Sequence, residues 1–261
     1  VTYSDTTAVA GTLYTYSVKA VAAAGATAAS ATDTGYRNLT APLSVAATDG
    51  TLTTGVTVTW AASTGATGYQ IWRAIGTGAA AQITTVGVVL TYSDTTAIAG
   101  TSYTYTVKAT GAVGVSVASA SDTGYRQLSA PLSVAATDGT LTTGVTVTWT
   151  ASTGATGYKI YRDGSESALA TVGAVLTYTD TTAVPGVSYA YTVRAITAAA
   201  LSAASLSNTG YRNLTAPLSV AATDGTLTTG VTVTWAASTG ATGYQVWRAI
   251  GAGVAAQIAT V

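Results

Sequence analysis

An internal repeat of nearly ninety residues constrains the fold of this chain more than any other feature. The run Gly-Val-Thr-Val-Thr-Trp occurs three times, and Ser-Thr-Gly-Ala-Thr-Gly-Tyr follows each copy after two residues. The tryptophans of this run are Trp60, Trp149 and Trp235, which are 89 and then 86 residues apart. Stacked solenoid repeats have periods of roughly 20 to 45 residues, so a unit of this length is a whole domain. The sequence therefore predicts a string of separate domains.

Aligned on this period, the 261 residues divide into two complete repeats and two half repeats. We expect the C-terminal half of a repeat at 1–39, complete repeats at 40–129 and 130–215, and the N-terminal half of a further repeat at 216–261. Two interpretations of the half repeats stay open. Either the sequence is a window on a longer array, or the C-terminal half of one molecule completes the N-terminal half of the next, as in donor-strand assembly.

The residue pattern inside a repeat indicates β-strands. Val56, Val58 and Trp60 lie at alternate positions with threonines between them, which predicts one apolar face and one Thr-covered face. A second alternating strand is expected over 103–109, and a weaker one over 115–121. About seven short strands per repeat, with no helical periodicity, predict an all-β fold of two packed sheets.

Composition excludes several classes of function. The chain has no Cys and no His, which rules out disulfides, thiolate or imidazole metal sites and His-dependent catalytic triads. Glu166 is the only glutamate, so a paired-carboxylate glycosidase would need aspartates, most of which lie in turn contexts. Basic and acidic residues number 10 each, which leaves no basic stripe for nucleic acid, and no segment is apolar enough for insertion into a membrane. We expect no catalytic residue, no cofactor and no metal.

Several motifs together resemble the fibronectin type III domain, particularly its bacterial versions. They are Ala-Pro-Leu-Ser-Val, Val-Thr-Val-Thr-Trp, Gly-Tyr-x-(Ile/Val)-(Trp/Tyr)-Arg and Pro-Gly-Val-Ser-Tyr-Ala-Tyr-Thr-Val-Arg-Ala, and the resemblance covers the whole chain. The resemblance implies tandem seven-stranded immunoglobulin-like sandwiches. It also implies two sets of fold residues: the core tryptophans Trp60, Trp149 and Trp235, and the corner tyrosines Tyr14, Tyr103 and Tyr189, whose hydroxyls would bond to backbone.

Three aromatic residues are candidate contact residues: Trp72, Tyr161 and Trp247. Each is one position out of phase with an inward tyrosine, so we expect it on the outer face of the three-stranded sheet. There it could stack on a sugar or on a neighbouring domain. Alternatively, it could simply cover the sheet together with the long stems of Lys108 and Arg194.

Two further sets of polar residues recur in the repeats. Asn38 and Asn213 each begin an Asn-Leu-Thr sequon, which makes them candidate N-glycosylation sites at exposed domain junctions. Aspartates precede Gly or Thr-Thr at fixed places, and turn chemistry explains them, with calcium bound between domains as the alternative. These aspartates are Asp49, Asp138 and Asp224 before Gly, and Asp5, Asp94 and Asp180 before Thr-Thr.

The surface composition favours self-assembly. Charged residues make up 8% of the chain, against about a quarter of a typical soluble domain. Uncharged faces of Thr, Ser, Ala and Gly approach one another easily, and a linker such as 125–131 leaves almost no free chain between repeats. Residues 34–70 reproduce 209–245 without a change, which suits a polymeric part.

We therefore predict a non-catalytic structural repeat protein that forms an extracellular filament, sheath or stalk on a microbial surface. Its expected partner is itself, by end-to-end or lateral association. The alternative is a binding or spacer module, either an adhesin stalk or the accessory carbohydrate-associated repeats of a secreted enzyme. In that alternative carbohydrate would be the partner.

Overall fold

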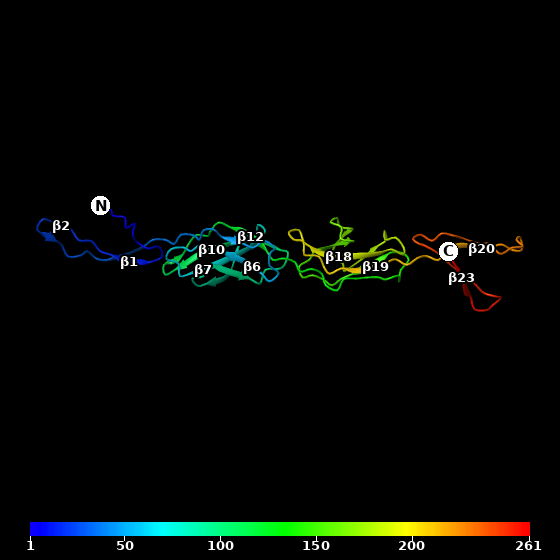
Figure 1. Ribbon diagram of the computed structural model, residues 1–261. Coiled ribbons are helices and arrows are strands. Elements are labelled where there is room, and N and C mark those ends of the chain that lie inside the picture. The colour runs from blue at the N-terminus through cyan, green and yellow to red at the C-terminus, as the bar shows by residue number, and fades with distance from the viewer. The chain divides into compact units, whose positions relative to one another are not determined.

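A computed structural model describes residues 1–261, and all of its named elements are β-strands (Figure 1). The prediction of an all-β fold is confirmed. The chain divides into two compact units, residues 1–129 with 196–201 and residues 130–195 with 202–261. None of its elements is a helix that could cross a membrane.

Residues 46–125 form a sandwich of two antiparallel sheets. The smaller sheet has the order β5 (Ala46–Ala47), β6 (Val56–Thr59), β9 (Thr91–Asp94). The larger sheet has the order β11 (Gly114–Val115), β10 (Ser102–Gly111), β7 (Gly68–Ile75), β8 (Ala81–Val86), and β12 (Asp122–Tyr125) also pairs with β10. Because β11 and β12 are two pieces of the last strand, the repeat has the seven strand positions that we expected.

Residues 135–211 form a second sandwich with the same plan. One sheet has the order β13 (Ala135–Ala136), β14 (Val145–Thr148), β17 (Thr177–Asp180). The other has the order β16 (Ala170–Val172), β15 (Gly157–Arg162), β18 (Ser188–Ile196), β19 (Asn208–Tyr211). The equal strand order follows from the equal apolar pattern of the two repeats.

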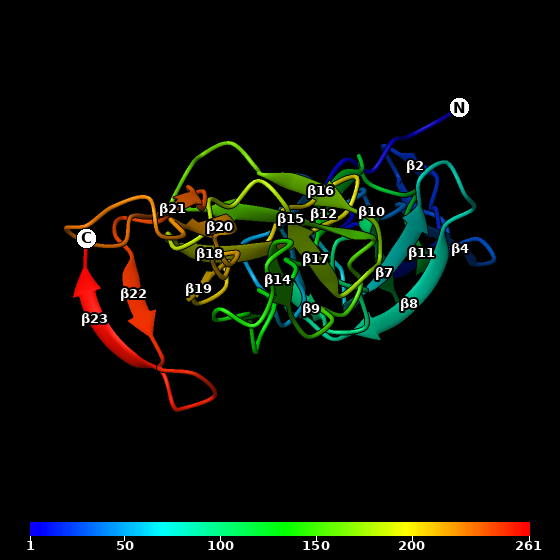
Figure 2. The same cartoon turned by 90° about the vertical axis from the view of Figure 1, so that its right-hand side faces the viewer.

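The remaining strands form only two-stranded sheets. Near the N-terminus, β1 (Leu13–Tyr16) pairs with β4 (Asp33–Tyr36), and β2 (Val21–Ala22) pairs with β3 (Gly25–Ala26). Near the C-terminus, β20 (Leu218–Ala222) pairs with β21 (Val233–Ala236), and β22 (Gln245–Arg248) pairs with β23 (Ala256–Thr260) (Figure 2). The boundaries of the half repeats stay a prediction.

The core of the first sandwich comes from alternate residues of the two facing sheets. Val56, Val58 and Ile71 are fully buried, and the ring of Trp60 lies 5.4 Å from the ring of Tyr69, centroid to centroid. Burial of such side chains is the main stabilising contribution to a sandwich. The strand alternation expected around this tryptophan is thus confirmed.

The structure shows where the core tryptophans and the corner tyrosines lie. Trp60 and Trp149 are each 4% exposed and belong to the cores, whereas Trp235 is only half-buried. All three corner tyrosine hydroxyls accept a bond from a backbone amide, as the resemblance implied. The pairs are Val9 N to Tyr14 at 3.0 Å, Ile98 N to Tyr103 at 3.2 Å, and Val184 N to Tyr189 at 3.3 Å.

The weaker strand expected over 115–121 is wrong beyond Val115, where β11 ends. Ser116 and Ser119 donate their amides to the carbonyls of Ala109 and Val107, at 2.8 and 3.0 Å. Their hydroxyl oxygens accept the amides of the same two residues, at 2.9 and 3.0 Å. Serines three residues apart thus serve partners two residues apart on β10, so a regular ladder cannot form.

Candidate functional site

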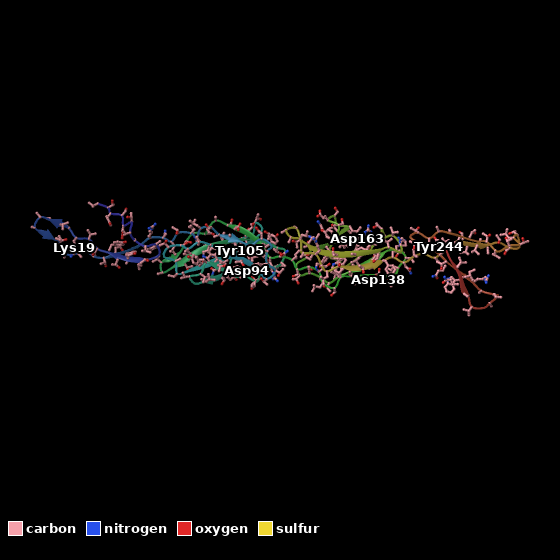
Figure 3. The ribbon with its side chains drawn as sticks, viewed as in Figure 1. Lys19, Asp94, Tyr105, Asp138, Asp163 and Tyr244 are labelled. Atoms are coloured by element: carbon pink, nitrogen blue, oxygen red, sulfur yellow. The ribbon has the colours of Figure 1, made fainter.

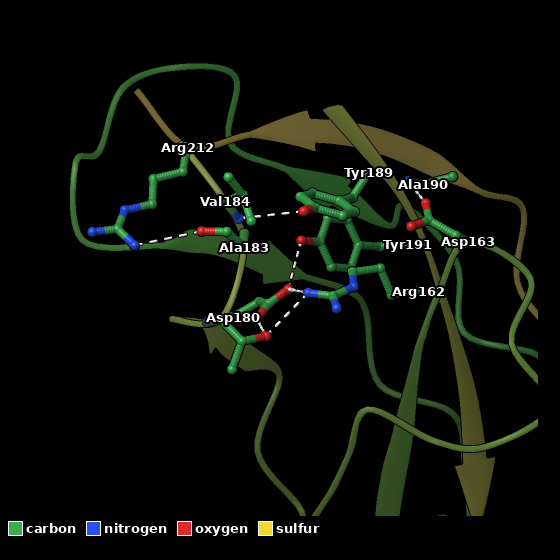
Figure 4. A network of polar contacts seen from close by, with 10 residues as sticks. Arg162, Asp163, Asp180, Ala183, Val184, Tyr189, Ala190, Tyr191 and Arg212 are labelled. Atoms are coloured by element: carbon green, nitrogen blue, oxygen red, sulfur yellow. Dashed lines mark hydrogen bonds and ion pairs between the residues drawn. The ribbon is translucent and has the colours of Figure 1, made fainter. Parts of the chain in front are cut away.

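A buried polar cluster lies between the two sheets of the second sandwich (Figure 4). Asp180 ends β17 and is fully buried. Its Oδ2 accepts bonds from the Arg162 guanidinium and from the Tyr191 hydroxyl, each at 2.8 Å. Its Oδ1 accepts the amide and the hydroxyl of Thr182, at 2.9 and 2.6 Å. Because β17 belongs to one sheet and β15 and β18 to the other, this cluster ties the two sheets together.

The partners of Asp180 hold it in the charged state. Burial on its own raises the pKa of this carboxyl, but hydrogen bonds from Thr182, Tyr191 and Arg162 outweigh it, so its pKa lies below the ordinary value. Burial, together with the hydrogen bond to Asp180, raises the pKa of the Tyr191 hydroxyl. The cluster is therefore an ion pair with a neutral tyrosine at neutral pH.

The first sandwich contains the same cluster. Asp94 accepts bonds from Arg73 at 2.6 Å and from Tyr105 at 2.9 Å, and these three residues come from β9, β7 and β10. Figure 3 labels Asp94 and Tyr105 in this part of the chain. Thr96 completes the set, with its amide and its hydroxyl both bonded to Asp94 Oδ1.

Turn chemistry explains only the local hydrogen bonds of Asp94. The bond from the Thr96 amide to Asp94 is the local turn bond that we expected. The ion pair with Arg73 was missed, because the two residues lie 21 positions apart on strands of different sheets. One signal was present, since each complete repeat carries both an arginine and an aspartate at these positions.

The cluster is not arranged for acid–base chemistry. Both buried carboxylates are engaged by an arginine, a tyrosine and a threonine, so no oxygen faces a space that a substrate could enter. No group of three or more His, Cys, Asp or Glu side chains that could hold a metal ion occurs in the structure. The geometry fits a clamp between sheets.

Trp72 and Tyr161 lie on the larger sheets and Trp247 lies on a two-stranded sheet, so the predicted placement on the three-stranded sheet is wrong. Trp72 is on β7 and Tyr161 on β15, because this strand pairs with the long strand β10 or β18 and not with the smaller sheet. Trp72 is half-buried, with the ammonium of Lys108 4.4 Å from its ring centroid. Tyr161 is 8% exposed, with the guanidinium of Arg194 at 5.4 Å. Cations thus cover both rings.

The third aromatic residue, Trp247, is exposed to solvent. Trp247 on β22 is 56% exposed, and no cation is stacked on it. The three aromatic residues belong to three different repeats, so the sequence does not bring them into one site. Trp247 is the most accessible of the three.

The two sequon asparagines, Asn38 and Asn213, are both exposed. Asn213 follows the end of β19 at Tyr211, its backbone amide donates to the Leu141 carbonyl at 2.8 Å, and its side-chain oxygen accepts the Leu214 amide at 2.9 Å. Of the aspartates before Gly, Asp49 and Asp138 precede Gly50 and Gly139, which have φ of 59° and 60°. A turn of this kind favours glycine.

Comparisons with known proteins relate the chain to parts of larger proteins. No family model matches it. Exoglucanase B of Cellulomonas fimi is 36% identical over 221 residues, which cover 74% of this chain and 19% of that protein. Endoglucanase B of Cellulomonas fimi is 32% identical over 234 residues, which cover 77% of this chain and 22% of that protein. Chitinase A1 of Niallia circulans is 37% identical over 166 residues, which cover 58% of this chain and 22% of that protein.

The chain thus spans about a fifth of the length of the curated relatives it matches. Among solved structures, a segment of two fibronectin type III domains from chicken tenascin superposes with a TM-score of 0.52. It covers 64% of this chain and 97% of that segment at 18% identity. At this identity the likeness concerns the fold, which is a tandem of two-sheet sandwiches.

Proposed function

We propose that the chain is a tandem array of fibronectin type III domains and that it serves as a non-catalytic spacer module of a secreted polysaccharide-degrading enzyme. The observation that carries this proposal is the similarity to about a fifth of each of two glucanases and a chitinase. A segment shared by enzymes with different names is best explained as a part that serves them in the same way. The proposed location is extracellular.

The buried clusters support a role without catalysis. Most glycoside hydrolases cleave the glycosidic bond with two carboxyl groups that face the same substrate. Asp94 and Asp180 are fully buried and paired with arginines, and they lie in different repeats. These carboxylates stabilise the sandwiches and leave no acid–base pair for a sugar.

Contacts inside the first compact unit support a spacer whose linker has little flexibility. Leu39, just before the first complete sandwich, is buried and packs against Gly11 and Gly111. A Cβ on Gly65 would overlap the carbonyl oxygen of Ala10. Such close backbone contact at a linker favours a fixed spacing over a flexible coil.

The experiment places this chain between the catalytic domain and the carbohydrate-binding domain of a glucanase. The control carries a Gly/Ser linker of 261 residues, the length of this chain. We expect equal hydrolysis of soluble glucan and faster hydrolysis of insoluble cellulose with this chain, while the chain alone hydrolyses neither. Hydrolysis by the chain alone, or equal rates on cellulose with both linkers, would contradict the proposal.

Weak contact with carbohydrate is a part of this proposal that can be tested separately. Trp247 offers an exposed indole face, whereas Trp72 and Tyr161 are covered. Aromatic faces stack on sugar rings, so Trp247→Ala should reduce retention of the chain on insoluble cellulose or chitin. The control is Trp72→Ala, and equal retention of all three proteins would remove carbohydrate contact at these residues.

A second candidate function is self-association into an extracellular filament or stalk. The specific observation that favours it is the low charge of the chain, in which charged residues make up 8% of the sequence. Surfaces with little charge repel one another weakly, which favours association. Regular fibres of the 261-residue chain in negative-stain microscopy are the expected result, and a monodisperse monomer at high concentration would exclude this candidate.

A further inference from the structure

We infer that Thr197 of the second repeat binds Gly100 of the first and thereby stabilises the turn of residues 98–101. Such support of one repeat by the next goes beyond the proposed function, because it is independent of what the array serves. Residues 196–201 begin at the last residue of β18, a strand of the second sandwich. They nevertheless belong to the compact unit that contains residues 1–129.

The loop of residues 196–201 differs from its counterpart because one glycine is replaced. In the first repeat, Gly111 pairs with Gly114 across a two-residue turn, and Gly114 has a φ of 136°. Ala200 occupies the place of Gly114 in the second repeat. Residues with a Cβ rarely adopt such a φ, so the second repeat cannot form the same tight turn.

Thr197 supplies the hydrogen bonds that hold this altered loop together. Its amide donates to the Ala200 carbonyl at 2.9 Å. Its hydroxyl oxygen accepts the amides of Ala199 and Ala200, at 3.3 and 3.1 Å. Because both acceptor positions of the hydroxyl are occupied, its hydrogen points out of the loop, and it is donated to the Gly100 carbonyl at 2.8 Å. The bonds within the loop thus direct the hydroxyl toward the first repeat.

Gly100 offers a surface that fits this side chain. It has a φ of 71°, which favours glycine, and its amide donates to the Arg126 carbonyl at 2.8 Å. A Cβ on Gly100 would lie 2.6 Å from Cγ2 of Thr197 and 3.1 Å from Cδ2 of Leu128. Gly100 therefore packs directly against both side chains, and Leu128 is buried. Thr197 is packed against the turn as well as hydrogen-bonded to it.

The corresponding place in the first repeat has no such hydroxyl. Gly111 occupies the place of Thr197, and Gly11 occupies the place of Gly100. A Cβ on Gly11 or Gly111 would lie 2.7 or 3.0 Å from a methyl carbon of Leu39, so packing alone joins these residues. Thr197 adds a polar contact to an arrangement that is otherwise apolar.

The turn of residues 98–101 carries a bond that the first sandwich needs. The Ile98 amide donates to the hydroxyl of the corner tyrosine Tyr103 at 3.2 Å, and the Thr101 amide donates to the Ile98 carbonyl at 3.2 Å. Loss of the Thr197 hydroxyl should therefore loosen a part of the first sandwich, although the substitution lies in the second repeat.

Hydrogen exchange of the full chain, followed by mass spectrometry, tests this effect with Thr197→Val, which keeps the shape of threonine and removes the hydroxyl. Loss of one hydrogen bond should make exchange in peptides covering 98–101 roughly 2- to 12-fold faster. Thr197→Ser keeps the hydroxyl and should exchange there like the unmodified chain. The matched control is Thr192→Val on β18, which should leave these peptides unchanged.

Three results would overturn the inference. The first is unchanged exchange over 98–101 in Thr197→Val, and the second is an equal acceleration in Thr192→Val. The third is faster exchange confined to residues 197–202, because it would show that the hydroxyl only caps its own loop.

A second variant approaches the contact from the first repeat. In Gly100→Ala the added Cβ would overlap Thr197, so exchange of the Ala199 and Ala200 amides should become faster. The control for backbone strain is Gly76→Ala, since Gly76 also has a positive φ, of 54°, but has nothing within 4 Å of an added Cβ. It should leave exchange in the loop unchanged, and equal exchange of the loop amides in both variants would contradict the contact.

Discussion

Replacement of Asp180 by asparagine tests whether the buried cluster clamps the two sheets together. Asparagine has the size of aspartate but no charge, so it keeps the packing and removes the ion pair. Its amide oxygen can still accept one bond, for example from the Thr182 amide. Arg162 is left without its partner, and the Tyr191 hydroxyl loses a charged acceptor.

The expected magnitude follows from the burial of the two partners. Removal of one partner of a buried ion pair costs about 3 to 5 kcal/mol. The Arg162 side chain is 27% exposed, while Asp180 is not exposed, so water recovers part of the loss. We therefore expect the second sandwich to lose about 2 to 3 kcal/mol of unfolding free energy.

Hydrogen exchange followed by mass spectrometry measures this loss for each sandwich separately. A decrease of about 2 to 3 kcal/mol corresponds to roughly 30- to 150-fold faster exchange of the protected amides. The change should appear in peptides from β15 and β18 and not in those from β10, which form an internal reference, because the sequences of these three strands each occur once in the chain. The matched control is Asp138→Asn, an exposed turn residue whose replacement should change stability by less than about 0.5 kcal/mol. If Asp180→Asn accelerated exchange no more than this control does, the clamp would be refuted.

Three further predictions concern the same sandwiches. The pKa values of Asp94 and Asp180 are lower in the folded state than in the unfolded state, so the stabilisation from their ionised form is complete above the ordinary carboxyl pKa near 4 and is lost as the pH falls through the folded-state pKa. The urea concentration at the unfolding midpoint should therefore fall when the pH is lowered below about 4, and it should fall less in the double variant with asparagine at both positions. Tyr189→Phe leaves the Val184 amide without its acceptor and should lower the stability of the second sandwich by about 1 to 2 kcal/mol in urea unfolding, whereas an unchanged midpoint would show that the corner bond is dispensable. Ser133 has a φ of 51°, so Ser133→Gly should raise the thermal midpoint by relieving about 1 kcal/mol of strain, and a lower midpoint would contradict this.

The elements that the sequence predicted well are those decided by local pattern. Alternation of Val and Thr before Trp60 and Trp149 identifies a strand with one buried face, whatever lies opposite it. The corner tyrosines bond to an amide five residues earlier, so their contact is also local. Both expectations are confirmed.

The elements that were missed depend on a distant partner. The end of the strand at Val115 depends on whether the next residues match the carbonyls and amides of β10, and Ser116 and Ser119 replace that ladder by side-chain bonds. The sheet that holds Trp72 depends on which long strand pairs with β7. Neither choice can be read from one strand alone.

The sequence by itself determined the repeat, the all-β class and the inward residues, because a period of two along a strand is a property of consecutive residues. Only the tertiary structure decided that Arg73 meets Asp94 and that Arg162 meets Asp180. Those residues lie on different sheets, and their distance depends on how the two sheets stack and in which register their strands pair. Stacking and register are properties of the assembled sandwich, and the residues of any single strand leave them open.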